Sequence, residues 1–306
     1  MLGRIAGAVR FKEHLSFHTS LRIGGPAEFF IVPQNLDDVR YALAFAEQEG
    51  LPVVTLGGGN NMVVADDGIK GVVLKLQGMF ARTEFHGDEV VVGAGVNLGT
   101  FIREAAARGL GGLEWLAGIP ATVGGALAMN VGAQERSICA SGAQIYFLHP
   151  DGTLAEARTV AGSPIATFRA PVGGVVLGCR MTLMRRPTVQ INKDINQRLK
   201  QKKASEPFAL AAAGYVWKNP PGDTATRLIA KAGLCGKRIN NAEISVKCAN
   251  LILNRGGATA SDVLALMEMT RDRVAAHSGV MLEAEIRTFG FEAPTFEPQP
   301  LELVPA

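Results

Sequence analysis

The chain has 306 residues, enough for two or three compact units that each have their own core. Apolar residues make up 47% of the chain and charged residues 19%, which predicts a globular protein and excludes an intrinsically disordered one. The 31 basic and 28 acidic side chains leave a net charge of only +3, so the concentrated basic face of a nucleic-acid-binding protein is not expected.

Location and redox state follow from what the sequence lacks. No apolar run approaches the roughly 20 residues of a membrane-spanning helix, and the first residues do not have the pattern of a secretory signal. Cys139, Cys179, Cys235 and Cys248 form no CxxC pair and are expected to be buried free thiols. We therefore expect a cytoplasmic protein with no membrane partner, no nucleic-acid partner and no metal site.

Strands and helices alternate over the first 110 residues of the sequence. Runs rich in β-branched and aromatic residues predict strands at 29–33, 52–57, 71–76 and 89–95. Amphipathic helices are predicted at 36–50, where Gly50 lies past the end, and at 97–110, where Asn97 is a candidate cap. This order is typical of an α/β unit.

The segment 111–133 is rich in Gly and Ala, is almost uncharged and shows no clean period. A surface loop would be more polar, so we expect irregular backbone that is buried against a partner, such as a cofactor, that satisfies its polar groups. Beyond it, residues 144–156 predict a hairpin and 174–184 a buried strand.

The composition turns polar at 191–207, which predicts an exposed helix that stops before Pro207 and leads to a domain boundary. A short helix is expected over 224–234 with Asp223 or Thr224 as its cap, and short strands over 242–246 and 249–254. A strong amphipathic helix over 261–279, capped by Ser261 and closed by Gly279, precedes an alternating strand at 281–290. Its expected buried face consists of Val263, Leu266, Met267, Thr270 and Val274.

Two Gly-rich stretches are candidates for ligand binding. GGGNN at 57–61 follows a predicted strand directly, and consecutive N–H groups in such a turn can bind a phosphate. It has neither the GxGxxG spacing of a Rossmann fold nor the Lys-Ser/Thr of a P-loop, and an ordinary tight turn fits it equally well. GIPATVGGALAMNVGA at 118–133 suggests that two backbone stretches surround one elongated ligand; a close-packed Gly/Ala crossover is the alternative.

The chain resembles the UDP-N-acetylenolpyruvoylglucosamine reductase family, in order, from about His18 to Gly290. The resemblance rests on HTSLRIGGPAEFF (18–30), LGGGNNMVVADDGIKGVVLKL (56–76), the segment 92–133, WKNP (217–220), TRLIAKAGLCGKRINNAEISVKCANLILN (226–254) and GVMLEAEIRTFG (279–290). It implies an α+β fold, with a two-part FAD-binding region of the vanillyl-alcohol-oxidase (PCMH) type over 1–75 and 76–190. A smaller α+β substrate-binding domain over 191–291 and a loose tail over 292–306 would follow.

The resemblance also implies the chemistry. FAD would be the cofactor and NADPH the reductant: hydride passes to the flavin and then to C3 of an enolpyruvyl ether, and C2 is protonated, which gives UDP-N-acetylmuramate for peptidoglycan. The positions that match the family's FAD-binding motifs are Gly57, Gly58, Gly59, Asn60, Asn61, Gly118, Ile119, Pro120, Thr122, Gly124, Gly125, Asn130 and Gly132.

The family's catalytic groups match this chain one position at a time. A cation that stabilises the intermediate corresponds to Arg169, and a supporting acid to Glu285, with Glu283 as a rival on the same predicted strand. Lys218 and Asn219 correspond to the Lys-Asn of the substrate-binding motif. Without the resemblance, a surface cation and a solvated edge-strand carboxylate would be the simpler interpretations of Arg169 and Glu285.

The proton donor is where the chain departs from the family. At the position where the family has Ser or Cys, this chain has Tyr215. The hydroxyl of a tyrosine reaches roughly 4 Å farther from the backbone than that of a serine. Other departures lie in the same half of the chain: Ala212 for Ser, Glu206 for Gln before Pro207, Asn240-Asn241 for a Gly pair, and Cys248 and Leu251 for His and Phe.

Three interpretations stay open. The chain is a reductase of this family in which Tyr215 is the acid, a diverged FAD-dependent oxidoreductase that acts on another small molecule, or a non-catalytic flavin- or nucleotide-binding protein whose pocket Tyr215 fills. The sequence does not predict the oligomeric state.

Overall fold

The computed structural model describes residues 1–133, 136–161, 168, 170–207 and 210–291. Their contacts divide the chain into two compact units. Unit 1 consists of Met1–Glu13, Ala27–Gly58 and Lys70–Ala204, and unit 2 of His14–Pro26, Gly59–Ile69 and the described part of Ser205–Ala306. The consecutive domains expected over 1–75, 76–190 and 191–291 stay a prediction, and we describe each unit by itself.

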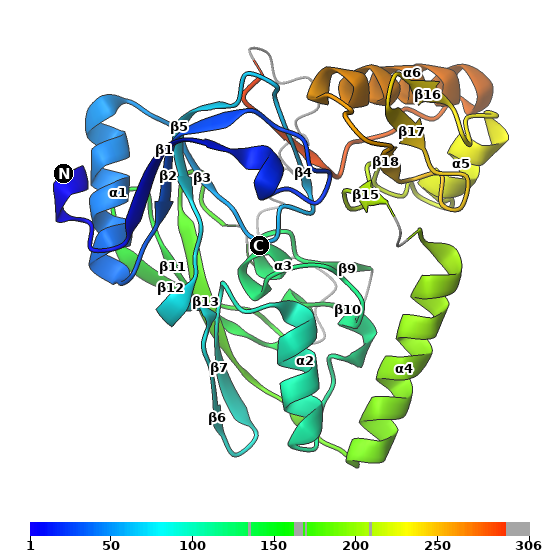
Figure 1. Ribbon diagram of the computed structural model, residues 1–306. Helices are drawn as coiled ribbons and strands as arrows, with labels where there is room; N and C mark the ends of the chain where they lie inside the picture. The colour runs from blue at the N-terminus through cyan, green and yellow to red at the C-terminus, as the bar shows by residue number, and fades with distance from the viewer. Residues whose placement is uncertain (134–135, 162–167, 169, 208–209, 292–306) are drawn as a thin grey trace. The chain divides into compact units, whose positions relative to one another are not determined.

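The first sheet of unit 1 has the strand order β1-β2-β5-β3 (Figure 1). Its strands are β1 (Ala8–His14), β2 (Pro26–Val32), β3 (Val53–Thr55) and β5 (Ile69–Leu74), and β3 runs parallel to β5. Helix α1 (Leu36–Glu49) begins where Asn35 Oδ1 accepts from Asp38 N at 2.9 Å and ends at Gly50 in the left-handed region, as predicted. Its buried face shares one core with β2 and β5.

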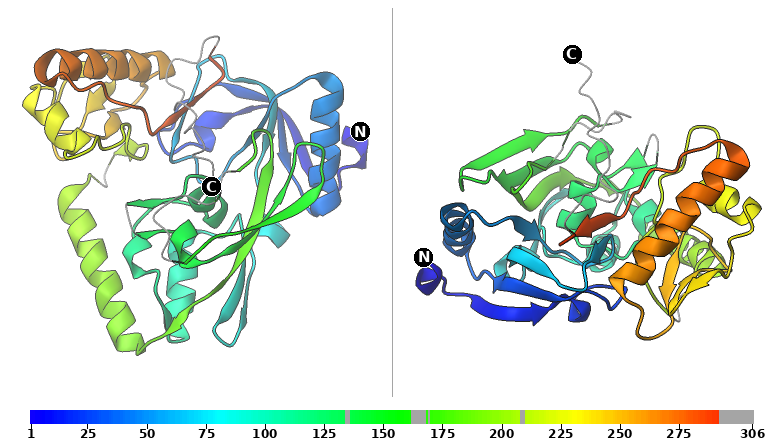
Figure 2. Two further views of the ribbon diagram at one scale, coloured as in Figure 1. Left: turned by 180° about the vertical axis from the view of Figure 1, so that it is seen from behind. Right: turned by 90° about the horizontal axis from the view of Figure 1, so that it is seen from above.

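The second sheet of unit 1 is antiparallel, with the order β12-β11-β13-β7-β6 (Figures 1 and 2). Its strands are β6 (Thr83–His86), β7 (Glu89–Gly93), β11 (Gln144–Leu148), β12 (Leu154–Arg158) and β13 (Val175–Thr182). Helix α2 (Leu98–Ala107) packs into the same core and is capped by Asn97, whose Oδ1 accepts from Thr100 N at 3.1 Å. The predicted hairpin, buried strand and Asn97 cap are confirmed.

The segment 111–133 differs from the irregular backbone expected of it, because it contains helix α3 (Val123–Ala128). A Cβ on Gly124 would lie 2.6 Å from Ala94 Cβ, so the glycine lets α3 approach the chain after β7 closely. The small residues therefore serve helix packing as well as loop geometry.

Short elements complete unit 1. They are the paired strands β8 (Leu110–Gly111) and β14 (Met184–Arg185), the paired strands β9 (Gly132–Ala133) and β10 (Arg136–Ser137), and helix α4 (Thr188–Ser205). Only Ile191 and Ile195 are buried in α4, which confirms the predicted exposed helix; it begins three residues earlier than expected.

Unit 2 contains a four-stranded antiparallel sheet with the order β15-β18-β17-β16. Its elements are β15 (Ala211–Ala212), β16 (Arg238–Ile239), β17 (Ala242–Ile244), β18 (Ile252–Asn254), α5 (Ala225–Lys231) and α6 (Ala260–Ser278). The predicted apolar face of α6 is buried and packs against this sheet (Figures 1 and 2). A separate parallel pair joins β4 (Met62–Val64) to β19 (Arg287–Phe289).

Two boundary predictions in unit 2 are wrong. Thr259, not Ser261, caps α6: Thr259 Oγ1 accepts from Asp262 N at 3.1 Å, Asp262 Oδ2 accepts from Thr259 N at 3.0 Å, and Ser261 instead donates to Asp66. The strand expected at 281–290 is only Arg287–Phe289, because its partner β4 is three residues long.

Of the four cysteines, Cys139, Cys179 and Cys248 are buried, as expected, but Cys235 is exposed. Cys235 lies between Gly233 and Gly236, both in the left-handed region, in a surface turn after α5, so no core residues cover it. Among the described residues, no helix is both long and apolar enough to cross a bilayer. The tail expected over 292–306 lies outside the described residues.

Candidate functional site

The Gly-rich turn at 57–61 presents consecutive N–H groups. Among the described residues, the N–H groups of Gly57, Gly58, Gly59 and Asn60 donate to no acceptor. The turn is held through its carbonyls, since Gly59 O accepts from Ser20 N at 3.0 Å and Asn60 O accepts from Gly214 N. A run of free N–H groups on a fixed turn suits an anion such as a pyrophosphate.

Gly59 is the residue on which this turn depends. Its φ is +65°, and a Cβ there would lie 2.1 Å from the carbonyl oxygen of His18. Only glycine fits both the left-handed conformation and this close approach.

The two Gly-rich stretches meet in unit 1. A Cβ on Gly57 would lie 2.7 Å from Thr122 Oγ1, and Thr122 Oγ1 also accepts from Gly125 N at 3.2 Å. Ile119 is half-buried and Pro120 exposed beside them. This contact places Gly57 next to Thr122, and the binding of one ligand by the stretches 57–61 and 118–133 stays a prediction.

The structure explains the residue types at Gly118, Asn130 and Gly132 without a ligand. A Cβ on Gly118 would lie 2.9 Å from a side-chain carbon of Lys202 in α4. Asn130 has φ +44° and accepts from Cys139 N at 3.2 Å through Oδ1, and Gly132 has φ +146°. These residues shape the backbone of unit 1, and their contact with FAD stays a prediction.

In unit 2, the segment 214–219 is held by Asn250. Trp217 N donates to Asn250 Oδ1 at 2.8 Å, Asn250 Nδ2 donates to Trp217 O at 2.7 Å, and Val216 N donates to Asn250 O at 3.0 Å. Trp217 is a core residue with 2% of its surface exposed. Val216 and Trp217 are buried, whereas the candidate residues on either side, Tyr215 and Lys218, are not.

Tyr215 is not a core aromatic residue. Its side chain is 42% exposed, and its hydroxyl donates to Glu206 Oε1 at 2.9 Å. The phenol group is therefore open to solvent and is held by a carboxylate.

The structure distinguishes the two candidate glutamates. Glu283 is exposed, and its carboxylate accepts from Lys218 Nζ at 2.9 Å. Glu285 is half-buried, its backbone N donates to Val216 O at 2.8 Å, and its carbonyl accepts from Asn61 Nδ2 at 3.0 Å. Burial raises the pKa of the Glu285 carboxyl above its ordinary value, and the nearby charge of Lys218 opposes this effect.

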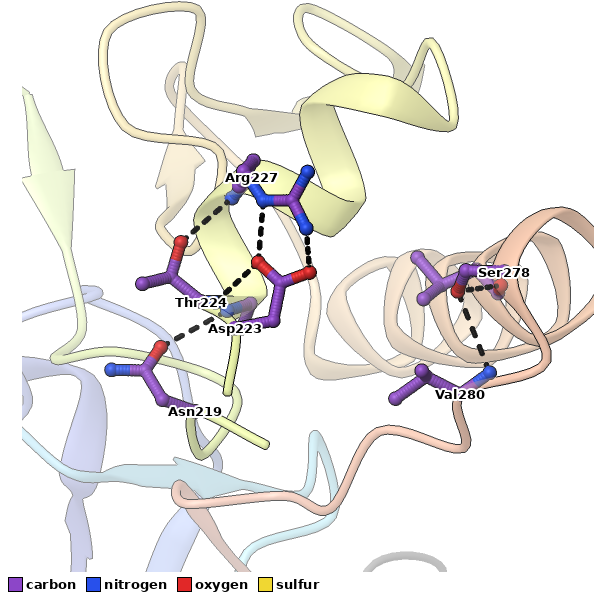
Figure 3. A network of polar contacts seen from close by, with 8 residues as sticks. Asn219, Asp223, Thr224, Arg227, Ser278 and Val280 are labelled. Atoms are coloured by element: carbon purple, nitrogen blue, oxygen red, sulfur yellow. Dashed lines mark hydrogen bonds and ion pairs between the residues drawn. The ribbon is translucent and has the colours of Figure 1, made fainter. Parts of the chain in front are cut away.

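Asn219 helps to begin helix α5. Its Oδ1 accepts from Ala225 N at 3.0 Å, next to the Thr224 cap and the Asp223–Arg227 ion pair (Figure 3). Of the two candidate caps, Asp223 and Thr224, it is Thr224 that caps α5. Within the described part of the chain, Asn219 Nδ2 donates to no acceptor, so this amide can still bind a ligand.

Arg169 lies outside the described residues. Its neighbour Phe168 is buried and packs against Phe147, with ring centroids 5.5 Å apart. No group of His, Cys, Asp and Glu side chains suited to a metal ion occurs among the residues that the structure describes.

Two contacts were missed by the sequence reasoning. Glu206 was recognised as a departure from the family, but its bond to Tyr215 was not predicted. Lys247 Nζ donates to the backbone carbonyl of Glu206 at 2.9 Å. The exchange of an amide for a carboxylate at 206, together with a phenol at 215, was the signal in the sequence.

Comparison with known proteins places both halves of the chain. Residues 27–158 match the family model "FAD binding domain", and residues 206–289 match "UDP-N-acetylenolpyruvoylglucosamine reductase, C-terminal domain". Among curated relatives, the UDP-N-acetylenolpyruvoylglucosamine reductase 2 of Symbiobacterium thermophilum is 40% identical over 299 residues, which cover 96% of each chain. The reductase of Geobacter sulfurreducens is 38% identical over 288 residues, 94% of this chain and 96% of the relative.

A solved structure is similar over almost the same length. The crystal structure of the UDP-N-acetylenolpyruvylglucosamine reductase from Thermus caldophilus superposes with a TM-score of 0.77 at 33% identity, and covers 93% of this chain and all of that one. These matches confirm the expected α+β fold, the FAD-binding region and FAD as the cofactor.

Proposed function

Since the chain belongs to the UDP-N-acetylenolpyruvoylglucosamine reductase family, a family of FAD-dependent oxidoreductases, we propose that it reduces UDP-N-acetylenolpyruvoylglucosamine to UDP-N-acetylmuramate with NADPH. The observation that carries the proposal is the arrangement around 215–218 in unit 2. There a phenol, an ammonium and a half-buried carboxyl group project from neighbouring backbone segments that hydrogen-bond to one another.

The residues present fit FAD. The free N–H groups of Gly57–Asn60 would hold its pyrophosphate, and the neighbouring stretch at Thr122 and Gly125 would lie along the rest of the cofactor. A bound FAD would supply the hydride-transfer chemistry between NADPH and C3 of the enol ether.

Lys218 and Glu285 would stabilise the negative charge of the substrate. Lys218 supplies a point charge for its diphosphate or carboxylate, and Glu283 orients the ammonium group. Burial raises the pKa of Glu285, and in its protonated form this carboxyl would donate a hydrogen bond to the oxygen on which charge develops. The role of Arg169 as a second cation rests on the family resemblance.

Tyr215 would be the acid of the second step. As C2 accepts a proton, the C2–H bond forms and the O–H bond of Tyr215 breaks, which leaves a phenolate that regains its proton from water. A phenol has a reference pKa of about 10, so it is a stronger acid than the aliphatic hydroxyl that serine would offer. The exposure of Tyr215 to solvent supports such a role.

One observation favours a second candidate. The Tyr215–Glu206 pair is bulkier than the serine and glutamine at these positions in the family, and a smaller or displaced substrate would accommodate it. The enzyme would then be an FAD-dependent oxidoreductase for another small molecule. A non-catalytic flavin-binding role is disfavoured, because such a protein has no need for Lys218 and Glu285 close together.

The test is NADPH oxidation by the purified holoenzyme with UDP-N-acetylenolpyruvoylglucosamine, with mass spectrometry of the product. We expect substrate-dependent NADPH consumption and a product that carries two more hydrogen atoms than the substrate. A flavin that NADPH reduces, but no turnover with this substrate, would support the second candidate instead.

A further inference from the structure

The contact between Tyr215 and Glu206 joins two segments of unit 2. Glu206 comes directly after the last residue of α4, Ser205, and Tyr215 lies nine residues farther along the chain. The hydroxyl of Tyr215 donates to Glu206 Oε1 at 2.9 Å, a normal length for such a bond. Both side chains are partly open to solvent, so the bond contributes little to stability.

Hydrogen bonds hold the main chain at both ends of this contact. On one side, Lys247 Nζ donates to the carbonyl of Glu206 at 2.9 Å, and Lys247 N donates to the buried Ser245 Oγ at 3.2 Å. On the other side, the residues before and after Tyr215 donate to Asn60 O and Asn250 O. Because both ends are anchored, the bond fixes where the phenol oxygen lies.

A phenol needs such a partner more than a serine does. Two rotatable bonds move its ring, and its oxygen lies roughly 4 Å beyond the position of a serine hydroxyl, so small rotations displace the oxygen widely. A displacement of about 1 Å at a reacting atom can lower a rate by about 100-fold.

We propose that Glu206 is a positioning residue for Tyr215, and that Lys247 holds Glu206 in place. The inference rests on the proposed function, in which Tyr215 protonates C2. At rest the phenol proton points at the carboxylate. When the substrate binds, rotation about the Cζ–O bond turns the proton toward C2 and breaks the hydrogen bond to Glu206. Glu206 therefore sets the position of the ring before this rotation.

The charge of Glu206 has the opposite effect to its hydrogen bond. A carboxylate next to a nascent phenolate disfavours proton release by like-charge repulsion. Glutamine keeps an oxygen acceptor and removes the charge, whereas alanine removes both. The proposal therefore predicts that Glu206→Gln reoxidises its flavin as fast as wild type or faster. Glu206→Ala should be slower than wild type.

The experiment measures flavin reoxidation by UDP-N-acetylenolpyruvoylglucosamine in NADPH-reduced, oxygen-free holoenzyme. We expect Glu206→Ala to lower the limiting rate constant about tenfold or more, with the half-saturating substrate concentration unchanged and Glu206→Gln restoring the rate. In a Tyr215→Phe background, Glu206→Ala should have no further effect, because it acts only through Tyr215. The flavin spectrum and the Tm of each variant control for folding.

Each other outcome overturns the proposal. If Glu206→Ala reoxidises as fast as wild type, Glu206 does not position Tyr215. If Glu206→Gln is as slow as Glu206→Ala, the charge acts and not the hydrogen bond. If wild-type flavin stays reduced with this substrate, the proposed function fails, and the role of Glu206 in it fails too.

Discussion

The family resemblance predicts a small hydroxyl or thiol at the position of Tyr215, where this chain has a phenol. The structure leaves 42% of this side chain exposed and bonds its hydroxyl to Glu206, so the ring is not needed in the core. A residue with this exposure can be substituted without creating a cavity. Its chemistry can therefore be tested separately from the stability of the fold.

Tyr215→Phe removes the only acidic proton of the side chain and keeps the ring. We expect the rate of flavin reoxidation by the enolpyruvyl substrate to fall by about 100-fold, as is typical for loss of a general acid. The rate at which NADPH reduces the flavin should not change, which serves as the internal control. Wild-type reoxidation in Tyr215→Phe would show that another group protonates C2.

Glu285 has a pKa raised by burial, and this has a defined consequence for stability. Above the reference pKa of about 4.3, the unfolded chain loses this proton more readily than the folded chain. Glu285 therefore costs stability as the pH rises, until the pH passes its folded pKa. Glu285→Gln does not titrate, so its stability advantage over wild type should grow from about pH 4 upward.

Urea unfolding of wild type and Glu285→Gln across this pH range measures the difference. A stability difference that shrinks as the pH rises would mean that folding lowers the pKa of Glu285, which would contradict the structure.

In Glu285→Gln the limiting rate of flavin reoxidation should also fall, and by more than in the matched variant of the exposed Glu283. The sequence could not rank these two glutamates, because their burial depends on the contacts of 285 with residues 61 and 216.

At the scale of elements, local signals predicted helices well and strand ends poorly. The caps Asn97 and Gly50 and the apolar face of α6 follow from spacing within one helix. The length of β19 depends on β4, more than 200 residues away in the sequence, and no local pattern contains it. The predicted start of α6 at Ser261 is wrong because Thr259 and Ser261 are both good cap residues, and the sequence alone does not choose between them.

The cap of α6 predicts a stability effect. Thr259→Ala should lower the free energy of unfolding by about 1 kcal/mol, because Asp262 N loses its acceptor. Thr259→Ser keeps the hydroxyl and should stay near wild type. Denaturant unfolding measures both, and equal stability of all three proteins would refute the capping role.

The turn at 57–61 predicts an effect on the cofactor. Gly59→Ala must adopt a left-handed conformation, which costs about 1–2 kcal/mol, and its Cβ would also collide with His18 O. We expect less FAD per chain after purification, measured by absorbance of the released flavin. Gly222→Ala is the matched control, because its φ is +75° but no atom lies within 4 Å of the added Cβ. Equal FAD content in both variants would contradict the role of the turn.

At the scale of the whole molecule, the composition of the chain and the order of its motifs predicted the fold better than the spacing of residues within single elements did. The FAD-binding and reductase motifs occur in family order over nearly the whole chain, and both family models match their halves. The grouping of residues 14–26 and 59–69 with the C-terminal part was not predicted, because it arises from long-range pairs such as β4 with β19. The +3 net charge gives no general attraction for a polyanion, so the proposed anionic substrate would have to be recognised by local groups such as Lys218.

The most direct test of the proposed function is a single turnover without oxygen. The holoenzyme is reduced with one equivalent of NADPH and mixed with UDP-N-acetylenolpyruvoylglucosamine, while the flavin absorbance band is followed. We predict that the band returns at a rate that saturates with substrate, and that UDP-N-acetylmuramate forms in proportion to the flavin. A flavin that stays reduced until oxygen is admitted would contradict the assignment of this substrate.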